Sequence, residues 1–165
     1  MRYATITARD DAPLAALIRR LLSANGLDIP GTAYYDEALD HLSAFYLADP
    51  ARRAYIVARE EAEEDGIGKL LGGAGLAECA LFPDCAELQK LYVSEDAQGR
   101  GLGTELVRRV EQEAVRRGCR RIYLETHTNL GAALHLYEKL GYRRIERPAQ
   151  VVHSTMNRFY LKELG

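Results

Sequence analysis

Apolar residues recur along the chain at two spacings, and the change of spacing separates predicted helices from predicted strands. In residues 14–21 they follow the i, i+3, i+4, i+7 pattern of an amphipathic helix, with Asp10 or Asp11 placed to cap its start. A second helix is predicted from about Tyr35 to Leu47. Shorter apolar runs at 2–9, 53–60 and 70–81 predict strands, and the acidic turn 60–69 joins the last two as an antiparallel hairpin.

The segment 86–93 is predicted as a strand whose apolar residues change parity. Leu88 occupies an even position, whereas Leu91 and Val93 occupy odd ones. Strict alternation cannot produce that change, so the pattern favours a β-bulge near Gln89-Lys90. A strand buried on both faces would also lose its alternation, and the sequence leaves this alternative open.

The second half of the chain alternates strands and helices. One helical face runs from Leu102 to Ala114 and ends at Gly118, and another helix is predicted at 129–141 with Asn129 as its cap. Strands are predicted at 119–126, 142–146 and 151–164. Because no repeat or linker divides the chain, we expect one α/β domain over residues 1–165.

The helix that begins near Leu102 is preceded by glycines at every second position, Gly99, Gly101 and Gly103. Each glycine costs about 1 kcal/mol relative to alanine in a helix, so a close backbone approach is the expected benefit. A strand, a glycine loop and a helix start together form an anion site, because the first helical N–H groups are unpaired. The spacing matches neither GxxxxGK[ST] nor GxGxxG, which excludes a P-loop and a dinucleotide fingerprint.

The composition of the chain limits the class of protein in which this phosphate site can lie. The chain has 165 residues, 47% of them hydrophobic, and a net charge of −2, which fits an ordinary globular domain without the basic surplus of nucleic-acid binders. No apolar run is long enough for a membrane span or a signal peptide. The three cysteines form no CxxC pair and the four histidines no ligand spacing, so we expect a cytoplasmic protein with no metal site.

The glycine segment fits the pattern [QR]xxGxG as Gln98-Gly99-Arg100-Gly101-Leu102-Gly103, flanked by ELQKLYV before it and NLGAALHLYEKLGYRRIE after it. With these flanks the chain resembles the GNAT superfamily of acetyl-CoA-dependent N-acetyltransferases. The resemblance implies an α/β GNAT fold: a mixed, mostly antiparallel sheet of about seven strands flanked by about four helices. It also implies that strands 86–93 and 119–126 run parallel and splay apart.

The same resemblance assigns residues to acetyl-CoA. The pantetheine arm would bond to the backbone of the strand before the loop, and the pyrophosphate would rest on the amides of the loop and helix start. The residues expected to hold acetyl-CoA are Leu91, Tyr92, Val93, Gln98, Gly99, Arg100, Gly101, Leu102, Gly103, Thr104 and Asn129.

Two residues are candidates for catalysis. Periodicity alone makes Tyr137 a core residue, whereas the resemblance implies that it is the general acid that protonates the leaving thiolate. Glu87 is either a surface glutamate or, as the resemblance implies, the base that accepts the proton of the amine. His127 is a second candidate base.

We therefore expect direct transfer of an acetyl group from acetyl-CoA to a primary amine, with a small-molecule acceptor favoured over a protein. Three alternatives remain: a non-catalytic acyl-CoA-binding sensor on the same fold, a protein or peptide N-acetyltransferase, and a nucleotide-binding regulator, which would bind ATP as tightly as acetyl-CoA. Release of free coenzyme A would separate an enzyme from a sensor. We expect no nucleic-acid or membrane partner, and the sequence leaves the oligomeric state open, a homodimer included.

Overall fold

The computed structural model describes residues 1–62, 66–152 and 154–165, so part of the predicted turn 60–69 and His153 lie outside the described residues. Three consecutive strands follow the first helices, and strands and helices then alternate as far as the last two strands. In order they are β1 Arg2–Thr5, α1 Ala8–Ala24, η1 Ala33–Tyr35, η2 Glu37–His41, α2 Leu42–Ala48, β2 Ala54–Arg59, β3 Leu70–Glu78, β4 Cys85–Val93, η3 Glu95–Ala97, α3 Leu102–Arg116, β5 Arg121–Thr126, α4 Gly131–Lys139, β6 Arg143–Ile145 and β7 Arg158–Glu163.

The strands form one mixed sheet in the order β1-β2-β3-β4-β5-β7-β6. Every neighbouring pair is antiparallel except β4 and β5, which run parallel. The seven strands and four α-helices of the described residues confirm the α/β fold class expected from the sequence.

The parallel pair β4–β5 opens along its length. The two strands pair only from Cys85 opposite Arg121 to Glu87 opposite Tyr123, although β4 continues to Val93. Beyond Glu87 the strands therefore diverge, as expected, and leave backbone groups of β4 without a partner on that side.

A β-bulge lies in β4 where the sequence pattern indicated one. Lys90 has a φ of 48°, and the pairing with β3 shifts by one residue between Gly73 and Gly75. The extra residue returns Leu91 and Val93 to the face that Leu88 occupies, which explains the change of parity.

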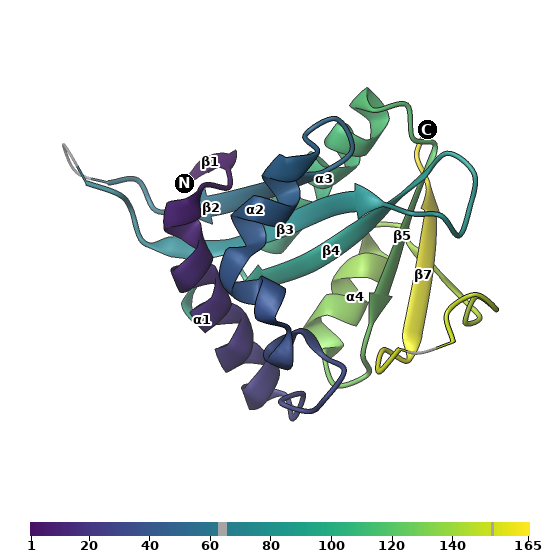
Figure 1. The fold of residues 1–165 in the computed structure, drawn as a ribbon, viewed down its shortest axis with the longest axis horizontal. Helices are drawn as coiled ribbons and strands as arrows, with labels where there is room; N and C mark the ends of the chain where they lie inside the picture. The colour runs from purple at the N-terminus through teal and green to yellow at the C-terminus, as the bar shows by residue number, and fades with distance from the viewer. Residues whose placement is uncertain (63–65, 153) are drawn as a thin grey trace.

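Helices cover both faces of the sheet. Figure 1 shows α1 and α2 in front of β2–β4, with α3 and α4 behind the sheet and α4 crossing behind the gap between β4 and β5. Two main clusters of buried apolar residues correspond to these layers, one under α3 and α4 and the other under α1 and α2.

Local capping explains where the helices differ from the predictions. Thr7, not Asp10 or Asp11, caps α1, and Asp10 completes a capping box with it. The predicted helix 35–47 is instead divided into η1, η2 and α2. The side chains of Thr32 and Asp36 accept backbone N–H groups, so each of them caps a new short helix instead of continuing one long helix.

Two further boundaries differ. α4 begins at Gly131 after Leu130, and Asn129 does not cap it. The last strand begins at Arg158 rather than at 151, since Ser154 and Asn157 use their side chains in loop hydrogen bonds. None of the helices in the described ranges is long and apolar enough to cross a membrane.

Candidate active site

A cleft of about 650 Å³ opens where β4 ends and α3 and α4 begin. Nine of the eleven residues predicted to hold acetyl-CoA line it: Leu91, Tyr92, Val93, Gln98, Gly99, Gly101, Leu102, Gly103 and Thr104. The other walls come from the last turn of α1 and from α4. The structure thus brings together the divergent end of β4 and the glycine loop, as the sequence predicted.

The three glycines have separate structural reasons. Gly99 and Gly101 both have a φ of 77°, a conformation that disfavours other residues, and a Cβ at either position would meet nothing within 4 Å. At Gly103 an added Cβ would lie 3.0 Å from Leu136 Cδ2, so this glycine lets α3 approach α4. Of these three glycines, Gly99 and Gly101 are therefore the two at which an added side chain would meet open space.

The start of α3 supplies donors for an anion. Its first backbone hydrogen bond with the loop runs from the Glu105 N–H to the Gly101 carbonyl at 3.1 Å, so the N–H groups of residues 102–104 precede the ladder. His135 and Lys139 line the opposite wall, one helical turn apart on α4. Unpaired amides, open space and a nearby cation fit a diphosphate group.

His135 and Lys139 were missed by the sequence analysis, although their i, i+4 spacing on the predicted helix was a usable signal. Leu21, Ala24 and Asn25 of α1 also line the cleft. No local pattern marks them, because their place in the site depends on how α1 packs against the sheet.

Two predicted cosubstrate residues lie outside the cleft lining. Arg100 is exposed in the loop, and Asn129 donates its side-chain amide to the Asn25 carbonyl at 2.9 Å. Asn129 therefore ties the β5–α4 loop to the end of α1. Gln98 lines the cleft and also donates to the Val93 carbonyl at 3.3 Å, which fixes the loop against the end of β4.

Tyr137 lies beneath the cleft rather than in its wall. It is 5% exposed, and its ring packs against Tyr142 and Tyr160 at centroid distances of 5.7 and 6.1 Å. Burial, and to a lesser extent Tyr92, raise the pKa of the Tyr137 hydroxyl, which is therefore protonated at neutral pH. Leu136, the residue before it, does line the cleft.

Glu87 lies at the last paired position of β4 and β5, on the face covered by α2. The Gln89 side chain donates to Glu87 at 3.0 Å, and the Tyr46 hydroxyl of α2 donates to Gln89 at 3.1 Å. Burial raises the pKa of Glu87 to about 6, with a smaller upward effect from Glu125, while the bond from Gln89 opposes the rise. A carboxyl group with this pKa is mostly ionised at pH 7 yet can accept a proton.

The other acidic and basic candidates near this point are held by neighbours. Tyr123 and Ser154 donate to the two oxygens of Glu125, at 3.0 and 2.8 Å. His127 Nδ1 accepts the Asn129 N–H at 3.1 Å, and its Nε2 lies 3.3 Å from the Asn157 amide nitrogen. Both imidazole nitrogens are thus engaged in the loop, which favours Glu87 over His127 as the free acceptor of a proton.

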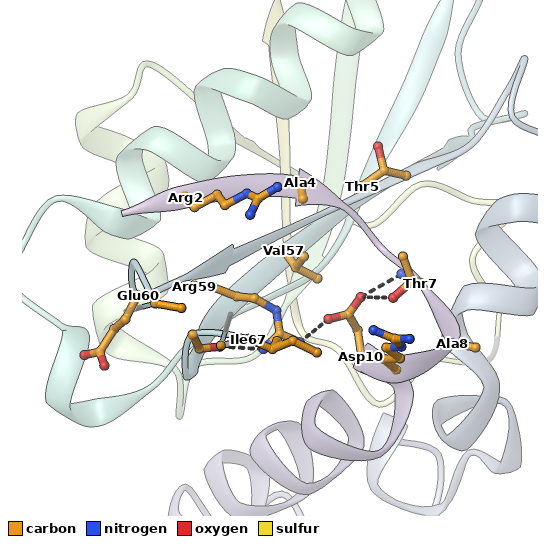
Figure 2. Close-up of a pocket in the computed structure, with 14 residues that line it drawn as sticks. Arg2, Ala4, Thr5, Thr7, Ala8, Asp10, Val57, Arg59, Glu60 and Ile67 are labelled. Carbon is orange, nitrogen blue, oxygen red and sulfur yellow. Dashed lines mark hydrogen bonds and ion pairs between the residues drawn. The ribbon is translucent and has the colours of Figure 1, made fainter. Parts of the chain in front are cut away.

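A second hollow, of about 460 Å³, lies beside the first turn of α1 (Figure 2). In it Asp10 accepts the Thr7 N–H and hydroxyl at 2.7 and 2.8 Å and forms an ion pair with Arg59. Arg59 also donates to the Gly68 carbonyl at 2.8 Å. These groups satisfy one another and fix α1 to β2, so Asp10 and Arg59 serve the fold.

Comparison with known proteins agrees with this geometry. Residues 17–142 match the family model "Acetyltransferase (GNAT) family". The chain is 32% identical over 143 residues to the uncharacterized N-acetyltransferase YjgM of Escherichia coli, which covers 86% of this chain and 81% of that protein.

Solved structures show the same fold. A GNAT-family acetyltransferase from Staphylococcus aureus Mu50 aligns with a TM-score of 0.83 at 19% identity, covering 99% of both chains. The putative acetyltransferase yncA of Salmonella typhimurium, solved with acetyl-CoA, aligns with a TM-score of 0.72 at 20% identity, covering 100% of this chain and 94% of that one.

A parallel, splayed strand pair with a glycine loop at a helix start defines an acyl-CoA-dependent transferase of the kind that the sequence resembled. The chain belongs to the acetyltransferase (GNAT) family. The expected enzyme class and the expected cosubstrate, acetyl-CoA, are confirmed at the level of the family.

Proposed function

We propose that this enzyme acetylates a primary amine on a small cationic molecule, with Glu87 as the general base and Tyr137 as the general acid. The observation that carries the proposal is the position of Glu87, at the point where β4 and β5 part. A group there lies beside the opening between the strands, toward which acetyl-CoA would extend from the cleft.

Glu87 has the properties that amine activation needs. A primary ammonium group must lose a proton before it can attack a thioester, and a carboxylate with a pKa of about 6 is ionised at neutral pH. Gln89 donates to one of its oxygens, and Tyr46 in turn donates to Gln89, which fixes the Glu87 side chain. The role of Glu87 does not require His127.

Tyr137 would supply the proton to the leaving thiolate from the other face of the sheet. Its raised pKa keeps the hydroxyl protonated until a strong base develops next to it. The neighbouring Leu136 lines the cleft, and the proposal requires the Tyr137 hydroxyl to come within reach of the sulfur when acetyl-CoA binds.

Gly99 and Gly101 would hold the pyrophosphate, assisted by the amides of residues 102–104. Leu91, Tyr92 and Val93 would pair with the pantetheine arm along the unpaired edge of β4. We extend this subsite to His135, whose imidazole can donate a hydrogen bond, and to Lys139, whose positive charge suits the phosphates.

The acceptor side favours a small cationic molecule over a peptide. Ser154, from the loop before β7, reaches over β5 to Glu125, and α2 covers the Gln89 side through Tyr46. Cover from both sides leaves less room for an extended chain than an open groove would. Glu87 and Glu125 together favour an acceptor with a positive charge.

We also place the enzyme in the cytoplasm, where acetyl-CoA is made.

Release of free coenzyme A tests the proposal. We would measure it with amino acids, polyamines, aminoglycosides and N-terminal peptides as acceptors, and we expect turnover with small cationic amines. Turnover with peptides alone would show that the acceptor is a peptide or protein and not a small cationic amine. Acetyl-CoA at 100 times its Kd should stabilise the fold by about 2.7 kcal/mol, and stabilisation without thiol release from any amine would indicate a sensor.

A further inference from the structure

Two free thiols face each other at the end of the β3–β4 hairpin, outside the machinery described above. Glu78 pairs with Ala86 as the last ladder position, and the same register continued by one residue places Cys79 opposite Cys85. Opposite residues in an antiparallel pair have Cα atoms about 4.5–5.5 Å apart, which lies within the range of about 4.4–6.8 Å that a disulfide requires. Both cysteines are reduced.

The surroundings of the two thiols are unequal. Cys85 is 9% exposed and packs with Tyr123 and Phe159, whereas Cys79 lies at the edge of the same cluster and is partly exposed. The Cys85 thiol donates to the Ala86 carbonyl at 3.4 Å. The neighbouring Cys85 thiol lowers the pKa of Cys79 to about 7, whereas Cys79 and, after it, burial raise the pKa of Cys85. An accessible thiolate next to a protected thiol is the arrangement of an attacking and a resolving cysteine.

We propose that Cys79 and Cys85 form a redox modification site, a dithiol that small disulfides convert to an intramolecular disulfide across the β3–β4 hairpin. The Cys79 thiolate attacks one sulfur of the small disulfide, whose S–S bond breaks and releases one thiolate. Cys85, losing its proton, then attacks the Cys79 sulfur of the mixed disulfide and displaces the second thiolate. The protein loses two electrons and two protons, and one small disulfide becomes two small thiols.

Cys119 provides an internal control. It packs against the apolar cluster under α3 and α4, on the other side of the sheet from the Cys79–Cys85 cluster, and burial raises its pKa. A thiol that is neither ionised nor opposite a partner should react slowly with a small disulfide. General oxidation would modify all three cysteines alike, whereas the proposed site would leave Cys119 reduced.

The test uses oxidised glutathione as the oxidant and mass spectrometry as the readout. Trypsin releases Cys79 and Cys85 in one peptide, 70–90, and Cys119 in another, 118–120. After oxidation and alkylation, we expect peptide 70–90 to carry no label and to have lost two hydrogens, while peptide 118–120 keeps its label. Two labels on peptide 70–90, or equal loss of label at Cys119, would overturn the proposal.

Two further measurements, with cysteine variants and with urea, test whether the disulfide forms because the fold aligns the thiols or only because the thiols are reactive. Cys85→Ser should stop at a stable glutathione adduct on Cys79, and Cys119→Ser should behave as the parent protein does. Folding holds the thiols together, so the equilibrium constant for closing the disulfide should be about tenfold or more larger in buffer than in urea. Equal constants in the two solvents would show that the native hairpin does not align the pair. None of these readouts depends on acetyl transfer.

Discussion

The cosubstrate side and the acceptor side of this enzyme are built by different means. The cosubstrate side is centred on one continuous stretch, the end of β4 and the start of α3, with α1 and α4 as its other walls. The acceptor side consists of side chains brought together from α2, β4, β5 and the loop before β7, such as Tyr46 on Gln89 and Ser154 on Glu125. A site built from backbone groups keeps its geometry when side chains change, which suits the cosubstrate side, where the ligand is always the same. A site built from side chains changes its shape and charge with each substitution, which suits the acceptor side.

The sharpest way to break this division is Tyr137→Phe, which removes one hydroxyl from the cosubstrate face. If Tyr137 is the general acid, turnover should fall by roughly 10²–10⁴, the usual effect of a positioned proton donor. Acetyl-CoA affinity should stay within a few-fold, because a thioester sulfur accepts hydrogen bonds poorly until it becomes a thiolate. Steady-state kinetics should then show kcat and kcat/KM falling together.

Tyr142→Phe is the matched control for that experiment. Tyr142 is 3% exposed and packs against the Tyr137 ring, so both variants lose a buried hydroxyl from one aromatic cluster. If Tyr137→Phe and Tyr142→Phe both turn over as the parent enzyme does, Tyr137 has only a structural role. Single-turnover measurement would exclude slow product release as the reason.

Glu87→Gln tests the acceptor side. Turnover at neutral pH should fall by about 10², and the loss should shrink as the pH rises, because free amine then becomes abundant without a base. In the parent enzyme kcat/KM should decline as the pH drops through about 6, where Glu87 becomes protonated. Glu146→Gln, which changes an exposed glutamate, should alter neither quantity.

A loss that does not vary with pH would contradict the assignment of Glu87 as the base. In that case a water molecule or His127 would have to accept the proton, and His127→Gln should then reproduce the pH profile expected for Glu87→Gln.

Gly101→Ala tests whether the loop binds phosphate or only begins a helix. An alanine at a φ of 77° costs about 1–2 kcal/mol of stability wherever it lies. Gly118 is the matched control, because its φ is 79° and a Cβ there also meets nothing within 4 Å. We expect similar losses of Tm in both variants but an acetyl-CoA Kd raised about tenfold, by isothermal titration, only for Gly101→Ala.

If Gly101→Ala and Gly118→Ala bind acetyl-CoA equally well, the loop serves only to begin the helix and does not bind phosphate. Gly103→Val, by contrast, cannot decide this question, since its side chain would strike Leu136 and disturb the packing of α3 against α4.

The two sides also differ in how far the sequence predicts them. The glycine loop and the bulge near Lys90 were predictable because each leaves a local pattern of spacing or parity, whereas the parallel pair was expected only from the resemblance. Gly103 has a further reason for being glycine, its close contact with Leu136 of another helix, and no local pattern indicates that contact. Asn129 was placed at a helix start by type alone, whereas its partner is Asn25, 104 positions away.

The acceptor side could not be assembled from the sequence for the same physical reason. Tyr46 and Gln89 lie 43 positions apart, and Glu125 and Ser154 lie 29 apart, with no periodicity to connect them. The helix expected near Tyr46 was predicted too long, because local side-chain caps outweighed the apolar pattern. Glu87 was found only through resemblance, and the hydrogen bonds that fix it became visible only in the structure.

Glu125→Gln is expected to have the smallest effect and tests how Glu87 is tuned. The charged and titratable groups that influence Glu87 or are influenced by it are Glu125 and Tyr123 of β5, Lys90 of β4, Tyr46 of α2 and Cys79 after β3. Glu125 is the carboxylate among them, and its negative charge raises the pKa of Glu87.

Removing that charge should lower the pKa of Glu87, so the acid limb of kcat/KM should move below about 6. The glutamine side chain keeps the size of Glu125 and can still accept from Tyr123, so the fold and the Tm should change little. Glu125→Asp retains the charge and should keep the parent midpoint, which a purely structural role would not predict. If the midpoint stays in place for Glu125→Gln while KM for cationic amines rises, Glu125 acts on the acceptor directly. A midpoint that moves upward would contradict the electrostatic argument, because removal of a negative neighbour cannot make a carboxylate harder to ionise.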